Sequence, residues 1–192
     1  MSDDAENREE LVDDAEVPEG VDDENLEALA EEDPAAAFKQ AGEIPGTHLR
    51  AAEYEADGWD TLQLHAGDVT AMVPTEDDDR FGIDVLVPDD EFDDLESLLA
   101  GDVSFDAYEA FRATADGLVL FVVAMEDRER EVAVLYPAYY DVKNAQGMLT
   151  AAENAGEMRT YVRTLTNDRI EFTHDEPQNF GPPTGVSGAD DE

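Results

Sequence analysis

The stretch VLYPAYYDVKN, residues 134–144, concentrates side chains that could do chemistry. Three of the chain's six tyrosines, Tyr136, Tyr139 and Tyr140, fall within five residues of one another here. Strand alternation places Tyr136 on the core side, and Pro137 is predicted to end the strand because proline lacks a ladder N–H. Tyr139 and Tyr140 would then lie in the following loop, at the end of a sheet where ligands often bind. Two interpretations stay open: these phenols line a binding site, or they only cover the rim of the core.

A second set of candidate side chains lies in the last predicted hairpin, MRTYVRTLTNDRIEFTH. Its Asn-Asp pair at 167–168 predicts a two-residue loop. That loop would place Arg163 opposite Phe172, and Tyr161 opposite His174. One face of the hairpin would then carry Arg159, Tyr161, Arg163, Leu165, Ile170, Phe172 and His174. A guanidinium on such an apolar face requires a partner, either an internal carboxylate or a bound small anion.

A single cleft holding Tyr139 or Tyr140 together with Arg163 and His174 would make the protein an enzyme of unassigned class. The familiar classes are disfavoured, because the chain has no GxSxG elbow, no Walker-type phosphate loop, no GxGxxG and no cysteine. The three histidines are far apart and form no HExxH pair, so neither a metal site nor a cofactor is predicted. Among 51 acidic residues no carboxylate pair stands out, and no catalytic residue can be named.

The formal net charge of −40 is the strongest signal in the sequence, with 51 Asp and Glu against 11 Lys and Arg. It fits a disordered acidic protein, a mimic of nucleic acid, or a protein adapted to molar salt. In molar salt the Debye length is roughly 3 Å, so carboxylate repulsion is screened. The acids occur in every segment and lysine is scarcer than arginine, which favours salt adaptation with K⁺ and water as the solvation shell. Binding of nucleic acid is disfavoured, because it needs a basic patch.

The organisation of the chain follows from its composition. Residues 1–33 and 175–192 are acidic or rich in Pro and Gly, and we expect them to be disordered tails around a single domain at 34–174. No apolar run reaches membrane length, and the start MSDDAENREE lacks a signal peptide's features. The sequence therefore predicts a cytoplasmic protein without a membrane partner.

Hydrophobic periodicity and turn residues predict the elements. In chain order they are helical segments at 34–46 and 47–58, a hairpin of strands 61–65 and 69–74, a strand at 81–88, a helix at 89–101, strands at 104–115, 118–126 and 131–137, a helix at 144–156, and strands at 158–166 and 169–174. Hairpins dominate this order. We therefore expect an α+β fold with a mostly antiparallel sheet of about 6–8 strands and three helices packed largely on one face.

Four stretches carry a resemblance to a known family: GWDTLQLHAGDV, YPAYYDV, AGEMRTYVR and FTHD. With these motifs the chain resembles a family of uncharacterised haloarchaeal proteins, a domain of unknown function. The resemblance covers roughly residues 47–180 and leaves out both tails. It implies a haloarchaeal cytoplasm, and it implies no activity and no site residues, because none is attached to the family.

Together these patterns favour a non-catalytic interaction or small-anion-binding regulatory module, whose partner is another protein or a small anion. The alternative is the enzyme with the Tyr/Arg/His cleft. The ligand-binding candidates are Tyr139, Tyr140, Arg159, Tyr161, Arg163 and His174.

Overall fold

The structure is a computed structural model that describes residues 47–115 and 117–183. The expected acidic tail at 1–33 and the first helical segment at 34–46 lie outside the described residues. In chain order the elements are α3 (Thr47–Ala56), β1 (Asp60–Gln63), β2 (Asp68–Met72), β3 (Gly82–Leu86), α4 (Asp89–Ala100), β4 (Ala107–Ala115), β5 (Leu118–Asp127), β6 (Val132–Asp141), α5 (Gln146–Ala155), β7 (Glu157–Arg163), β8 (Arg169–Asp175) and the 3₁₀ helix η1 (Pro177–Phe180). The described part thus has three α-helices and eight strands, which confirms the α+β prediction.

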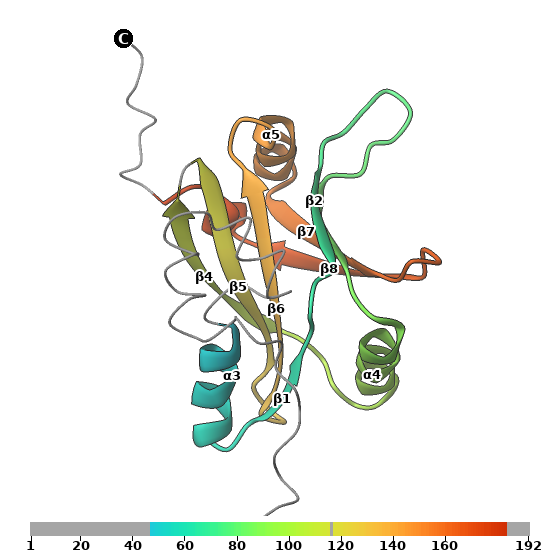
Figure 1. Ribbon diagram of the computed structural model, residues 1–192, viewed down its shortest axis with the longest axis vertical. Helices are drawn as coiled ribbons and strands as arrows, with labels where there is room; N and C mark the ends of the chain where they lie inside the picture. The colour runs from blue at the N-terminus through green and yellow to red at the C-terminus, as the bar shows by residue number, and fades with distance from the viewer. Residues whose placement is uncertain (1–46, 116, 184–192) are drawn as a thin grey trace, which may run out of the picture.

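The strands form two sheets rather than the single sheet expected (Figure 1). Sheet A has the order β1-β6-β5-β4, and sheet B has the order β2-β3-β7-β8. The neighbours pair antiparallel except β1 with β6 and β3 with β7, which are parallel. Both sheets are therefore mixed, although antiparallel pairs predominate.

The prediction that residues 61–65 and 69–74 form a hairpin is wrong, because β1 and β2 belong to different sheets. The chain changes sheets within a few residues. The backbone N–H of Leu64 still donates to Leu135 of sheet A, at 2.8 Å, while that of Gly67 donates to Leu86 of sheet B. Apolar alternation predicted both strands correctly but does not encode which partner each strand pairs with.

The main core lies between the two sheets. Buried side chains of sheet A, such as Phe121 and Val123, pack in one cluster with Ile83 and Val85 of sheet B. The helix α4 adds Phe92 and Leu95 to this cluster, and α5 adds Met148 and Ala152. The third helix, α3, packs on the other face of sheet A, away from sheet B (Figure 1), where Ala51 joins a smaller cluster with Val122 and Leu135.

The strand β6 continues through Pro137, which was predicted to end it. Its parallel neighbour β1 stops at the pair Gln63↔Leu135, so from there on β6 has only β5 as a ladder partner. A proline is tolerated where one side of a strand has no partner, because no ladder bond is lost there. Tyr139 and Tyr140 consequently lie in the strand and not in a loop.

The last hairpin has a register that differs from the predicted one by three residues. The pair that closes the ladder is Arg163↔Arg169, and the connection is five residues long, closed by a bond from the N–H of Thr164 to the carbonyl of Asp168. Because side chains alternate, an odd shift moves one strand's side chains to the opposite face relative to its neighbour. His174 and Phe172 therefore share a face with Met158 and Thr160, not with Arg163.

The described fold extends beyond residue 174, the predicted end of the domain. The strand β8 ends at Asp175, and Phe180 of η1 is fully buried in the main core. The hydroxyl of Tyr140 donates to the Phe180 carbonyl at 2.6 Å. Arg112 on β4 donates to two further carbonyls of this segment, those of Gln178 and Gly181.

Candidate anion-binding site

The outward face of sheet B carries the candidate site, because alternation sends every second side chain of its strands away from the core. On β7 these side chains are Arg159, Tyr161 and Arg163, while Met158 and Val162 point into the core. On the parallel neighbour β3 the outward residue is Asp84, which pairs with Tyr161. Two charged residues and a tyrosine from β7 thus lie beside an acid from β3.

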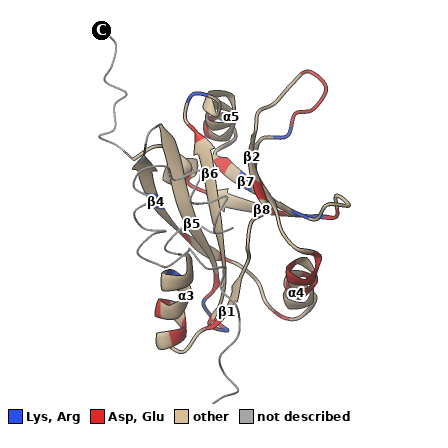
Figure 2. Ribbon diagram, in the orientation of Figure 1, with Lys and Arg blue, Asp and Glu red and all other residues tan. Residues whose placement is uncertain are grey.

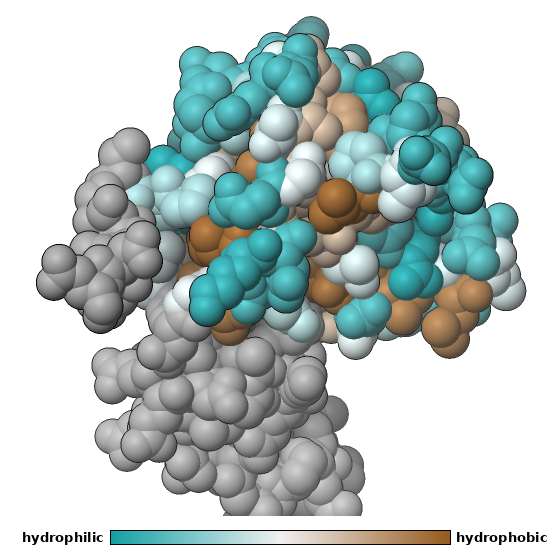
Figure 3. All heavy atoms as spheres, turned by 90° about the horizontal axis from the view of Figure 1, so that it is seen from above, coloured by the Kyte–Doolittle hydropathy of each residue, from teal (hydrophilic) through white to brown (hydrophobic). Residues whose placement is uncertain are grey.

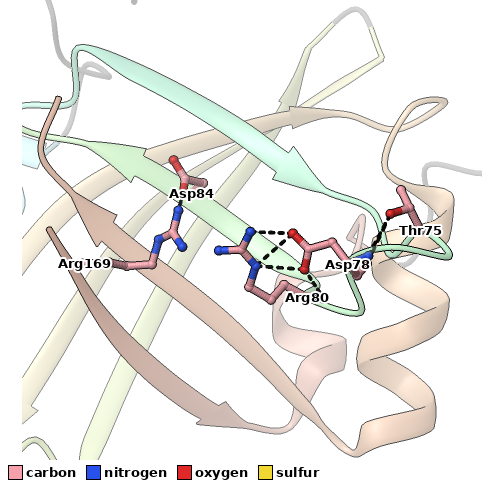
Figure 4. A network of polar contacts seen from close by, with 5 residues as sticks. All are labelled: Thr75, Asp78, Arg80, Asp84 and Arg169. Carbon is pink, nitrogen blue, oxygen red and sulfur yellow. Dashed lines mark hydrogen bonds and ion pairs between the residues drawn. The ribbon is translucent and has the colours of Figure 1, made fainter. Parts of the chain in front are cut away.

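Asp84 is the centre of an ion-pair cluster. Only 5% of this residue is exposed. The Nε of Arg163 donates a hydrogen bond to its Oδ1, and the guanidinium of Arg169 on β8 lies 3.9 Å from its Oδ2. Figure 4 shows Arg169 reaching across the sheet to this carboxylate. Two arginines from two strands therefore neutralise one buried carboxylate, as a buried charge requires.

The loop between β2 and β3 contributes a third arginine. The Nε of Arg80 donates to both carboxylate oxygens of Asp78, at 2.8 and 3.0 Å, and its Nη2 forms an ion pair with the same carboxylate (Figure 4). This hydrogen bonding lowers the pKa of Asp78 to about 2. The backbone N–H of Asp78 donates to the Thr75 hydroxyl at 3.1 Å, which fixes the turn. Arg80 is thereby held in place by its own loop.

Arg159 is the fourth arginine of the face. Its Nε donates to Glu157 at 2.9 Å, and Glu171 on β8 lies 3.6 Å away. Its guanidinium also lies over the ring of Phe81, 4.9 Å from the centroid. These contacts hold the Arg159 guanidinium above the Phe81 ring, an arrangement in which a cation and a ring attract each other.

Tyr161 lies beneath these arginines. It is 1% exposed, and Arg169 lies over its ring at 5.7 Å. Its hydroxyl is the one buried side-chain oxygen or nitrogen in the described part of the chain that has no hydrogen-bond partner. Burial raises the pKa of this phenol, while a close polar contact with the Arg159 guanidinium, which falls outside hydrogen-bond geometry, and the charges of Arg159 and Arg80 oppose the rise. The hydroxyl therefore stays protonated at neutral pH and has a proton to donate.

The position of these arginines is notable in so acidic a chain. With two lysines among 11 basic residues, nine are arginines, and four of the nine lie on this face. Figure 2 shows the basic residues on the β2–β3 loop and the β7–β8 hairpin, while α4 is largely acidic. Four carboxylates, those of Asp78, Asp84, Glu157 and Glu171, face the four guanidiniums. The face is thus locally neutral, and each guanidinium still has N–H groups beyond those already bonded.

The structure divides the predicted site residues among different places. Arg159, Tyr161 and Arg163 do come together on the outward face of sheet B. His174 lies on the inward face, buried beside Tyr136. Since Arg163 and His174 lie on opposite faces, the single cleft predicted for Tyr139 or Tyr140 with both of them does not form.

His174 belongs instead to a small polar network in the core. Its Nε2 lies 3.1 Å from the hydroxyl of Thr160 and 3.4 Å from that of Tyr136. The Tyr136 hydroxyl donates to Thr160 at 3.0 Å. Burial lowers the pKa of His174 to about 4, so the imidazole is neutral at pH 7. The ring is therefore held between two hydroxyls rather than next to a charge.

Tyr139 and Tyr140 lie apart from the arginine face of sheet B and from the polar network around His174. Tyr140 is buried against Phe121, and its hydroxyl is bonded to the Phe180 carbonyl. Tyr139 is partly buried at the edge of the main core, and burial raises the pKa of its phenol. The interpretation of these two tyrosines as core and rim residues fits their positions.

Sequence reasoning missed Asp84, Arg80 and Arg169. Asp84 did carry a signal, because it is a single acid between Ile83 and Val85 in a strand whose other residues are buried or nearly so. An acid at such a position calls for a cationic partner. Arg169 was assigned to the opposite face by the mistaken register, and Arg80 lies in a loop whose approach to β7 no local pattern encodes.

In a comparison with known families, a family model matches residues 43–182. The chain belongs to DUF7529, a family of unknown function. No curated protein matches the chain, and no solved structure matches it. None of the described helices is long and apolar enough to cross a membrane. In the same residues no three His, Asp or Glu side chains are grouped so that they could hold a metal ion.

Proposed function

We propose that this member of DUF7529 is a non-catalytic, small-anion-binding regulatory module, and that the outward face of sheet B is its binding site. The ligand would be a small oxyanion such as a phosphate or a carboxylate. The observation that carries the proposal is the Tyr161 hydroxyl, which is buried beside Arg159 and Arg80 and makes no hydrogen bond of good geometry.

The chemistry of the face suits an oxyanion. Leaving a buried hydroxyl unsatisfied costs about 1–3 kcal/mol, so such a group is rarely kept without a use. An oxyanion at Tyr161 would accept hydrogen bonds from this hydroxyl and from N–H groups of Arg159 and Arg80. Planar guanidinium groups match the oxygens of carboxylates and phosphates in pairs, which favours this ligand class over halides.

A docking surface for another protein receives less support from the described residues. Their exposed large hydrophobic side chains are Leu49, Val73 and Leu165, which lie on α3, after β2 and in the β7–β8 loop. Seen from above, brown apolar residues are scattered among teal polar ones (Figure 3). Protein interfaces of stable complexes need a larger continuous apolar patch.

We also propose that the protein works in a salt-rich cytoplasm of a haloarchaeon. The support is the net charge of −40 and the spread of acids over all parts of the chain. The helix α4 illustrates this, since its sequence DDEFDDLESLLA has six acids and no base. Under such conditions the short, partly buried contacts of the arginine face are screened less than exposed charges are.

Thermal unfolding with and without inorganic phosphate tests the binding proposal, with malonate as the carboxylate probe and K⁺ and ionic strength held fixed. Phosphate or malonate should raise the Tm of the wild-type protein, because a ligand of the folded state stabilises it by about 2.7 kcal/mol at one hundred times its Kd. Tyr161→Phe should be at least as stable as wild type without the anion, yet lose most of the anion-dependent rise. Arg159→Met should also lose that rise.

Arg128→Met is the matched control, because Arg128 lies in the β5–β6 turn with 63% of its side chain exposed. It should keep the full response to the anion. The proposal would be overturned by an equal rise in Tm for wild type, Tyr161→Phe and Arg159→Met, or by no rise in wild type with either anion.

A further inference from the structure

A pocket lies on the outer face of sheet A beside α3, on the opposite side of the molecule from the arginine face of sheet B. Its volume is about 300 Å³. The helix α3 contributes Arg50 and Tyr54, and Trp59 follows it. The strands β4 and β5 contribute Phe111 and Glu126. This pocket shares no residue with the arginine face of sheet B.

Aromatic rings form the walls of this pocket. Tyr54 and Trp59 pack edge to face, with ring centroids 5.3 Å apart. Phe111 pairs with Val122 in the sheet and is partly buried against the cluster beneath α3. All three rings are only half-buried. The faces of an aromatic ring carry the negative part of its quadrupole, so a cation is attracted to a ring face that it can reach.

Carboxylates form its floor and rim. Glu126 is 4% exposed; its Oε1 accepts a 2.6 Å hydrogen bond from the Tyr54 hydroxyl, and its Oε2 accepts one of 2.8 Å from Arg128 in the β5–β6 turn. Glu109 lies 3.4 Å from the same hydroxyl. Burial and both carboxylates raise the pKa of Tyr54, so its phenol remains a donor and adds no charge of its own. The acids lining the pocket outnumber its one arginine, Arg50.

One cation of the chain, the guanidinium of Arg50, already lies in this pocket. The guanidinium of Arg50 lies over the Phe111 ring, 4.0 Å from the centroid, and its Nη1 is 2.8 Å from Glu53. The Arg50 side chain is 40% exposed and the Glu53 side chain 64% exposed, so this contact is at the surface. Exposed cation–π and ion-pair contacts are weak, so a ligand can displace them.

From these contacts we propose that the pocket binds a compact organic cation, a quaternary ammonium group, between Trp59 and Phe111 and above Glu126. Arg50 acts as an intramolecular competitor that swings out when the cation enters. Aromatic faces recognise quaternary ammonium groups, whereas proteins that select K⁺ surround it with rings of oxygen atoms that replace its water. The pocket therefore selects an alkylated ammonium over the potassium ions of its solvent.

Trp59 is the chain's single tryptophan, so its fluorescence reports on this pocket alone. The probe is tetramethylammonium chloride, titrated into the full chain while KCl is reduced so that chloride and ionic strength stay constant. We expect a saturable change in Trp59 emission. Neopentyl alcohol, a neutral molecule of similar shape, should give no saturable change, because it lacks the charge that the rings and Glu126 recognise.

Variants distinguish binding in the pocket from a general effect of the protein's net charge. Phe111→Leu should weaken binding about fivefold, since one cation–π contact is lost. Arg50→Gln should tighten binding about fivefold, because it removes the competing cation. Lys143→Gln is the matched control: it removes one positive charge from an exposed position after β6 and should leave the affinity unchanged.

Circular dichroism checks that each variant is folded, and Arg50→Gln alters a surface side chain, so the test does not depend on a core substitution. Three results would each overturn the proposal: no saturable emission change in the folded wild type, the same change with neopentyl alcohol, or equal tightening by Arg50→Gln and Lys143→Gln.

Discussion

Arg163 on β7 donates a hydrogen bond to Asp84 on the parallel neighbour β3, although the two residues are not directly paired. Arg163 pairs with Leu86, and Asp84 pairs with Tyr161, so the guanidinium reaches back by two residues along the strand. The side chains are 20% and 7% exposed. This contact ties the two central strands of sheet B together on the face that carries the proposed anion site.

Arg163→Met should lower the free energy of unfolding by about 2–3 kcal/mol, measured by urea denaturation at fixed KCl. Removing one partner of a buried pair costs about 3–5 kcal/mol, and the smaller value follows because Arg169 stays 3.9 Å from Asp84. The double variant Arg163→Met with Asp84→Leu should recover most of the loss, because no uncompensated carboxylate remains. A double variant as unstable as the single one would contradict this pairing.

His174 should make stability depend on pH between about 7 and 4. Its pKa is about 4 in the folded protein and about 6.5 when unfolded, so below pH 6.5 the unfolded state binds more protons. Its contribution to stability is complete above pH 6.5, is lost as the pH falls through this window, and changes no further below pH 4. At 1.36 kcal/mol per pH unit the full loss is about 3 kcal/mol.

The measurement is the free energy of unfolding of wild type and His174→Gln across this pH range. Only the difference between the two proteins is informative, since many carboxylates also titrate there. His48→Gln is the control, because His48 is exposed on α3. A constant difference between wild type and His174→Gln would show that the imidazole is not buried in its neutral form.

Gly82 should tolerate no side chain, because it allows β3 to approach β7 beneath Arg159. Its φ is +136°, and a Cβ would lie 2.2 Å from the Arg159 carbonyl oxygen. Gly82→Ala should therefore destabilise the protein by about 3 kcal/mol or more. Gly58→Ala shares a positive φ but meets nothing within 4 Å, so it should cost only about 1 kcal/mol. Equal losses in urea denaturation would refute the close approach.

Phe180 should be essential for stability even though it lies beyond the predicted domain boundary. Phe180→Ala should lower the free energy of unfolding by about 3–5 kcal/mol, as expected for a fully buried aromatic ring. Leu165→Ala, at a residue that is 79% exposed, should stay within about 0.5 kcal/mol of wild type. A stable fragment ending at residue 174 after limited proteolysis would speak against the docking of η1.

Molar salt should stabilise the fold. The Tm from circular dichroism should rise between about 0.1 M and 2 M KCl, because the Debye length falls to a few ångströms. The double variant Asp93→Asn with Glu96→Gln removes two exposed acids of α4, three residues apart. It should melt higher than wild type at low salt and equally at high salt. An unchanged wild-type Tm would remove the case for salt adaptation.

The sequence by itself determined where the strands and helices of the described region lie and where two of the hairpins turn. The strands predicted at 104–115 and 118–126 correspond to β4 and β5, which pair as an antiparallel hairpin. Such features depend on local propensity and on periodicity, which neighbouring residues encode directly. The binding candidates Arg159, Tyr161 and Arg163 were also found in this way, because they alternate along one strand.

Only the tertiary structure decided which strands share a sheet and which face of each strand is buried. Neither the split of β1 and β2 between two sheets nor the pairing of β3 with β7 leaves a local trace, because both depend on partners far away in the chain. The register of the last hairpin shows the physical reason most clearly. Its turn took five residues instead of two, and this odd shift placed His174 in the core and left Arg163 outside, beside Asp84.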